Sequence, residues 1–156
     1  MHGLARCGHL ELCRLIIENV QDKNPADTLG QTPLHWAAEK GHLEVCRLII
    51  ENVQDKNPGD VDKRTPLHWA AEEGHEDVCR LITENIQVKN PADRWGQTPL
   101  HYAAKQGHLE VCRLILDKVE DKNPKDQNGV TPLMNATSCN NPYIIKLFQN
   151  TMRSQK

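Results

Sequence analysis

Histidine and cysteine recur in this sequence at the spacing of metal ligands. A His-x3-Cys pattern occurs at His42/Cys46, His75/Cys79 and His108/Cys112. Residues four apart share one face of a helix, and both side chains are zinc ligands. Zinc, however, needs four ligands that converge at roughly 2.0–2.3 Å. We expect the cysteines to be small buried apolar residues and the histidines to suit a turn, so no metal site is predicted.

A second set of histidines could suggest acid–base catalysis. His35, His68 and His101 each follow the tripeptide Thr-Pro-Leu. No carboxylate or nucleophile shares their period in a suitable place, and the sequence has no glycine-rich phosphate-binding loop. We therefore predict that the chain is not an enzyme, with no catalytic residues and no cofactor.

The net charge of the chain is too small to favour a partner by electrostatics alone. The 156 residues carry 19 Lys and Arg against 21 Asp and Glu, a formal net charge of −2. Such a chain has no general reason to bind nucleic acid or an anionic membrane. No apolar run approaches the roughly 20 residues of a membrane helix, and charged residues interrupt the region where a signal peptide would lie. We expect a cytoplasmic or nuclear protein that neither binds nucleic acid nor inserts into a membrane.

The sequence segments that contain these histidines and cysteines repeat along the chain. The tripeptide Thr-Pro-Leu begins at Thr32, Thr65, Thr98 and Thr131, always 33 residues apart. This period divides a single domain, residues 1–156, into blocks 1–26, 27–59, 60–92, 93–125 and 126–156. The first block is partial. The last is degenerate, and its polar substitutions suit a solubilising C-terminal cap.

One block contains two short helices. The segment from Asp27 to Gly30 forms a turn, in which glycine takes positive φ without steric cost. Thr32 and Pro33 start a helix that stops at Gly41, and a second helix spans about 43–52. Helices of this length do not persist alone, so stacking must stabilise them. The pattern predicts an all-α solenoid.

The block resembles the ankyrin-repeat signature. The matching residues are Gly30, Thr32-Pro33-Leu34-His35-Trp36-Ala37-Ala38 and Gly41-His42, and they recur from Thr65 and Thr98. The resemblance covers essentially the whole chain. It implies antiparallel helix pairs with projecting hairpin-like loops, and a His35 ring that ties the Thr of its own repeat to the adjoining loop. It also implies a protein partner bound by the concave face and the loop tips.

Two kinds of position depart from the family pattern. Lys63 stands where the other full blocks have glycine, which costs about 1 kcal/mol if the site keeps positive φ. Val53 stands where the family usually ends the second helix with glycine. A β-branched residue resists the left-handed conformation, so we expect Asn52 to carry the turn or the helix to run on.

Positions that differ between blocks are free to specify a partner. They lie at the loop tips and at the ends of the first helices. The predicted partner-binding residues are Leu29, Gln31, Lys40, Asp62, Arg64, Glu73, Arg94, Trp95, Gln97 and Gln106. Trp95 is the sharpest candidate, because a Trp at an interface often contributes about 2 kcal/mol or more. Neutral variation of solvated loops is the alternative explanation for the differences between blocks. For Trp95, the alternative is a ring that folds back over its own hairpin.

Two other functions stay open at this point. The matching asparagine of ankyrin repeats is sometimes β-hydroxylated, which makes Asn57 and Asn90 candidate substrates of an asparaginyl hydroxylase; hydrogen bonding to the loop backbone is the structural alternative. The chain could also be a spacer in a larger protein. Met1 aligns with Leu34, so the sequence starts in mid-helix, and we expect a fragment. We expect a monomer, and the aromatic column Trp36, Trp69 and Tyr102 is expected mainly to pack between repeats.

Overall fold

The computed structural model describes residues 1–153, which form helices and loops and no strand. The helices are α1 (His2–Arg6), α2 (Leu10–Asn19), α3 (Pro33–Glu39), α4 (Leu43–Asn52), α5 (Pro66–Glu73), α6 (Glu76–Asn85), α7 (Pro99–Gln106), α8 (Leu109–Lys118), α9 (Pro132–Ser138) and α10 (Pro142–Arg153). This confirms the all-α prediction. The block boundaries themselves stay a proposal, and the last block includes residues 154–156, which lie outside the described residues.

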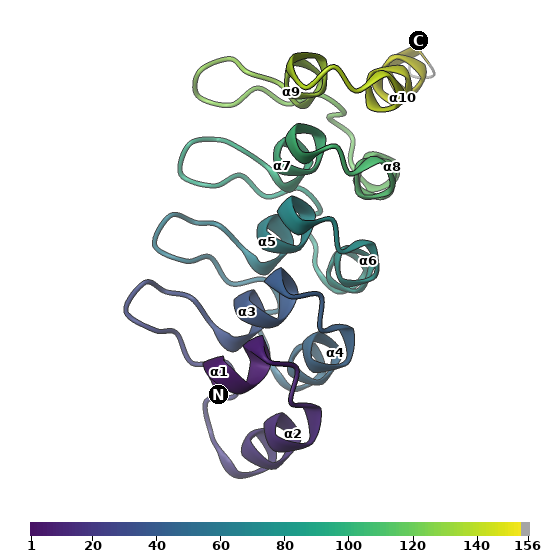
Figure 1. Ribbon diagram of the computed structural model, residues 1–156. Coiled ribbons are helices and arrows are strands. Elements are labelled where there is room, and N and C mark those ends of the chain that lie inside the picture. Colours follow the sequence, from purple (N-terminus) through teal and green to yellow (C-terminus); the bar gives the residue numbers. More distant parts are fainter. Residues whose placement is uncertain (154–156) are drawn as a thin grey trace.

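The helices stack as pairs in two rows (Figure 1). The inner helices α1, α3, α5, α7 and α9 contact one another in that order, and the outer helices α2, α4, α6, α8 and α10 do the same. Four finger loops, residues 27–31, 60–64, 93–97 and 126–130, project from the inner row on the side away from the outer row (Figure 1). The arrangement is a solenoid, so each pair is stabilised by its neighbours.

The inner helices α3, α5 and α7 each begin at a Thr-Pro pair that a histidine ring secures. Thr32 is extended at the N-cap of α3, and Pro33 occupies the first turn. The Nδ1 atom of His35 accepts the Thr32 backbone N–H at 3.0 Å, and its Nε2 atom donates to the Arg64 carbonyl oxygen at 3.0 Å. The ring thus ties its own repeat to the next finger loop, which confirms the role that the resemblance implies. His68 and His101 make the equivalent bonds.

The outer helices α2, α4, α6 and α8 each end at an extended residue and not at a left-handed one. α4 ends at Asn52, and Val53 is extended, with φ −121° and ψ 154°. The Asn52 side chain donates from Nδ2 to the Leu48 carbonyl oxygen at 2.8 Å. The expectation of a left-handed Asn52 or a longer helix is therefore wrong. The extended conformation suits a β-branched residue, and the amide satisfies a carbonyl at the helix end.

Small and aliphatic side chains fill the space between the pairs. Leu34, Ala37 and Ala38 of α3 are fully buried, as is Ile49 of α4. The cysteines of the outer helices are also buried: Cys46, Cys79 and Cys112 of the His-x3-Cys pattern, and Cys13 one period earlier. The prediction that they act as small apolar residues is confirmed.

A histidine in the turn between the two helices of a pair joins that pair to the preceding one. The Nε2 atom of His75 donates to the Glu39 carbonyl oxygen at 2.9 Å. Equivalent bonds join His42 to Arg6 and His108 to Glu72. The opposing turn must carry glycine, because a Cβ at Gly41 would lie 2.6 Å from the His75 Nδ1 atom. Sequence analysis expected a polar turn residue here and missed the contact between repeats.

Lys63 has the backbone conformation that its place in the repeat demands. Its φ is 59°, close to the 74° of Gly30 and the 81° of Gly96 at the equivalent positions. The fold therefore keeps positive φ at a residue with a Cβ, at a cost of about 1 kcal/mol.

Candidate partner-binding surface

Each finger loop is a tight turn held by one aspartate. In the first complete loop, the Asp27 backbone N–H donates to the Gln31 carbonyl oxygen at 2.9 Å. The Asp27 carboxylate accepts the backbone N–H groups of Leu29 and Gln31, both at 2.9 Å. Aspartate occupies the equivalent place in the other finger loops, at Asp60, Asp93 and Asp126. Each finger loop is therefore held in one turn by hydrogen bonds from its own residues.

Backbone hydrogen bonds also fasten each finger loop to the next. The Val61 N–H donates to the Leu29 carbonyl oxygen at 3.0 Å, and the Arg94 N–H donates to the Asp62 carbonyl oxygen at 2.8 Å. Gln127 continues the series to the carbonyl oxygen of Trp95 at 3.0 Å. The loop tips are therefore one connected edge rather than separate flexible loops.

The connected edge exposes large apolar side chains at three successive tips. Leu29 is 54% exposed, Val61 60% and Trp95 44%. We call these three residues the fingertip row. Val61 was absent from the predicted set, although its column (Thr28, Val61, Arg94, Gln127) varies as much as that of Trp95. The sequence signal that could have identified Val61 is an apolar residue at a variable loop position.

A charged pair lies beside the fingertip row. Arg94 and Asp62 form an ion pair at 2.8 Å between neighbouring loops, and the Arg94 guanidinium carbon lies 5.7 Å from the centre of the Trp95 ring. Half of the Arg94 side chain remains exposed. The fold thus brings Asp62, Arg94 and Trp95 together, and the Arg94 guanidinium lies over one face of the Trp95 ring.

Arg64 lies in a different setting from Arg94. Its guanidinium carbon is 4.9 Å from the ring centre of Trp69 and 4.8 Å from that of Tyr102, and it also pairs with Glu72. The side chain is only 21% exposed. Arg64 therefore acts as a clamp between two repeats, because it contacts a ring from each of them.

The aromatic column of the inner helices packs between repeats. Trp36 and Trp69 have ring centres 5.9 Å apart, and the Tyr102 hydroxyl donates to the Asp93 carboxylate at 2.9 Å. All three rings are half-buried. This confirms the expectation that the column packs between repeats.

The remaining predicted residues divide by exposure. Gln31 and Gln97 are half-buried, and the Gln97 amide donates to the Asp126 carboxylate at 3.2 Å. Lys40, Glu73 and Gln106 are exposed at the ends of α3, α5 and α7.

The sequence of the chain matches the family model for ankyrin repeats over residues 1–92 and 81–154. The chain belongs to the ankyrin-repeat family. Ankyrin repeats are generic protein–protein interaction modules and are typically not enzymes. A comparison with curated protein sequences finds no match. None of the helices in residues 1–153 is both long enough and apolar enough to cross a membrane.

The repeat asparagines hold the loops that precede the inner helices of this ankyrin array. The Asn57 Oδ1 atom accepts the Leu67 backbone N–H, and Asn90 does the same for Leu100, both at 3.1 Å. Both asparagines are half-buried. The structural role considered for them is present, and their hydroxylation stays a prediction.

Burial favours the uncharged forms of the cysteine and histidine side chains inside the ankyrin array. Burial raises the pKa of the Cys46 thiol to about 12 and lowers the pKa of the His68 imidazole to about 4. A thiol in that state is a poor nucleophile and a poor ligand, since the thiolate is the reactive form. Within residues 1–153, no group of three or more His, Cys, Asp or Glu side chains is placed to hold a metal ion.

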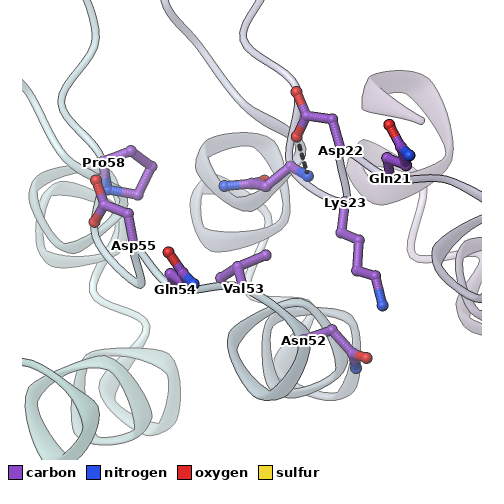
Figure 2. A pocket seen from close by; sticks show the side chains of 9 residues that line it. Gln21, Asp22, Lys23, Asn52, Val53, Gln54, Asp55 and Pro58 are labelled. Carbon is purple, nitrogen blue, oxygen red and sulfur yellow. Dashed lines mark hydrogen bonds between the residues drawn. The ribbon is translucent and has the colours of Figure 1, made fainter.

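Open cavities recur where the loops that follow successive outer helices of the ankyrin array meet. One cavity, of about 410 Å³, lies between the loops that follow α2 and α4. Lys23, Asn52, Val53 and neighbouring residues line it (Figure 2). The next interval along the array has a similar cavity of about 380 Å³. Their lining follows the repeat, so they do not single out one ligand site.

Proposed function

We propose that this ankyrin array binds another protein through the fingertip row and the adjoining Asp62–Arg94 pair. The observation that carries the proposal is the exposure of Leu29, Val61 and Trp95 at three consecutive tips. Large apolar side chains that stand together on a surface are typical of protein interaction sites. The partner protein contributes an apolar patch that contacts the fingertip row and charged groups that are complementary to Asp62 and Arg94.

The rigidity of the edge supports this function. The finger loops are held by aspartate caps and by backbone bonds between neighbouring tips, so little conformational entropy is lost when a partner docks. Trp95 serves as the anchor, since tryptophan is enriched among the residues that dominate binding energy. Lys40, Glu73 and Gln106 extend the surface towards the inner helices.

A matched pair of variants tests the proposal. The first changes the fingertip row (Leu29→Ser, Val61→Ser and Trp95→Ser). The control changes two exposed valines of loops after the outer helices, Val20→Ser and Val88→Ser. Proteins captured by crosslinking from a reduced cell lysate are compared for the native chain and both variants, with circular dichroism to show that each is folded.

The fingertip variant is expected to lose a protein that the native chain and the control variant both capture. Identical captures by all three forms would contradict the proposal. The alternative, a spacer segment within a larger protein, would then be favoured.

A further inference from the structure

The loops that follow the outer helices share a capping bond that one of them lacks. In three of these loops an aspartate carboxylate accepts the backbone N–H of the residue two positions on, over 3.0–3.1 Å, at Asp22, Asp55 and Asp121. Val88 occupies this position in the loop after α6, so the Asn90 N–H lacks that acceptor. The Val88 side chain is 65% exposed. Both features work against stability, which is typical of positions that serve a function.

Val88 lies between two open cavities. One, of about 380 Å³, lies between the loops that follow α4 and α6, and the other, of about 520 Å³, lies between the loops that follow α6 and α8; Val88 lines both. Val119 and Pro124 add apolar surface to the larger cavity. Packed helices lie about 8–10 Å apart, and three residues of an extended chain span about 10 Å. An extended segment that crosses Val88 therefore places a side chain in each cavity.

The larger cavity has an excess of positive charge. It is lined by three lysines, Lys89, Lys118 and Lys125, and by two carboxylates, Glu120 and Asp121. The cavity between the loops after α2 and α4 has one lysine and two aspartates, and the cavity between the loops after α4 and α6 has one of each. The positive charge therefore belongs to one interval of the array and does not follow from the repeat.

Lys118 and Lys125 supply charge that the chain leaves unpaired. Both side chains are exposed, and neither forms a hydrogen bond or an ion pair within residues 1–153. The Lys89 Nζ atom, in contrast, donates to the Thr83 carbonyl oxygen at 2.6 Å. The Asp121 carboxylate caps its own loop. The two ammonium groups are therefore available to carboxylates of a partner.

We propose that Val88 and the cavity between the loops after α6 and α8 bind an extended segment of a second protein that carries an apolar side chain next to carboxylates. The apolar side chain packs against Val88, Val119 and Pro124, and the carboxylates pair with Lys118 and Lys125. The same two lysines disfavour a basic segment. None of the three fingertip-row residues lines this cavity, so the inference goes beyond the fingertip row and does not depend on it.

The test uses Val88→Asp, which restores the aspartate of the other three loops. The variant is expected to fold and to have a higher urea midpoint, because the new carboxylate caps the Asn90 N–H. A random peptide library is first cleared on this variant and then selected on the native protein, which removes peptides that bind elsewhere, including at the fingertip row. The remaining peptides are synthesised, and their dissociation constants are measured by fluorescence anisotropy. Val20→Asp, at an exposed valine of the loop after α2, is the control for added charge.

The selected peptides are expected to combine an apolar residue with Asp or Glu. Val88→Asp should weaken their binding at least tenfold, whereas the Val20 control should leave it unchanged. The double variant Lys118→Gln, Lys125→Gln should also weaken binding at least tenfold and should flatten its dependence on salt. The control pair Lys63→Gln, Lys146→Gln removes two exposed lysines of other segments and should change neither.

A selection from which no peptide survives would overturn the proposal. So would enrichment of basic or uncharged peptides, or binding that both lysine pairs weaken equally. These outcomes concern only peptides that require Val88, so the proposal for the fingertip row is tested separately.

Discussion

The Val61 backbone N–H donates to the Leu29 carbonyl oxygen at 3.0 Å, and this bond holds two exposed apolar side chains at neighbouring loop tips. The link matters because the two residues belong to different repeats and to loops that sequence analysis treats as separate. The surface proposed to bind a partner is therefore part of the rigid array, and variants can change its side chains without altering the fold.

Thiol accessibility is expected to divide the six cysteines into two classes. Cys7 and Cys139 are exposed, and the four cysteines of the outer helices are buried. Titration of the native protein with a thiol reagent should modify Cys7 and Cys139 rapidly, and the other four only in denaturant. Rapid modification of Cys46 in the native protein would contradict the packing described here.

Acid is expected to destabilise the fold through its buried histidines. Burial lowers the folded-state pKa of His35, His68 and His101, with His68 at about 4. As the pH falls, the histidines of the unfolded chain therefore take up protons at a higher pH than those of the folded chain. The contribution of these neutral histidines to the free energy of unfolding is fully present above pH 6.5 and is lost as the pH falls from there through about 4. His68 alone accounts for about 3 kcal/mol over that window, since one pKa unit corresponds to about 1.4 kcal/mol.

Urea unfolding at a series of pH values checks this dependence. The midpoint should fall between pH 6.5 and 4, and His68→Gln should flatten the fall while lowering stability at pH 7. A midpoint that is constant over this range, or an unchanged slope in the variant, would contradict the assignment.

Relief of backbone strain is expected to stabilise the second finger loop. Lys63 has φ 59°, a conformation that glycine adopts without a Cβ clash. Lys63→Gly should raise the free energy of unfolding by about 1 kcal/mol, measured by urea unfolding at pH 7. Lys40→Gly, at a position with ordinary right-handed φ, is the control and should not stabilise the protein. Loss of stability in Lys63→Gly would show that the lysine side chain makes a contact that outweighs the strain.

The two finger-loop arginines are expected to behave differently. Arg64 lies between the Trp69 and Tyr102 rings, so Arg64→Gln should lower stability by about 1–2 kcal/mol. Arg94 is half-exposed, and Arg94→Gln should change stability by less than about 0.5 kcal/mol. Equal effects of the two substitutions on the urea midpoint would refute the distinction between a clamp and a surface residue.

The fold could be predicted because the 33-residue period places the same helix starts, turns and buried residues in every block. The expectation for Asn52 failed for a local reason. Without glycine, either a left-handed Asn52 or a longer helix was expected, whereas Val53 continues in an extended conformation and the Asn52 amide satisfies a carbonyl. The inter-repeat bond of His75 was missed, although the glycine opposite it, Gly41, recurs at Gly8, Gly74 and Gly107 and was visible in the sequence.

The site could be predicted only in part, because a variable column does not distinguish exposed from clamped side chains. Arg64 and Gln97 share a column, yet Arg64 is enclosed by two rings from different repeats. Whether a side chain is enclosed depends on neighbours one period away. Val61, by contrast, lies in a variable column and is exposed, and only the structure showed it next to Leu29.

Site-specific photo-crosslinking tests the central claim most directly. Val61 is replaced by benzoylphenylalanine in one protein and Val88 in a control, because both valines are exposed and lie on different loops. After illumination in a reduced lysate, the protein labelled at position 61 is expected to form one discrete crosslinked species that the position-88 control lacks. Trp95→Ser in the same chain should abolish that species. A crosslinking pattern that is the same from both positions, or that persists with Trp95→Ser, would contradict partner binding through the fingertip row.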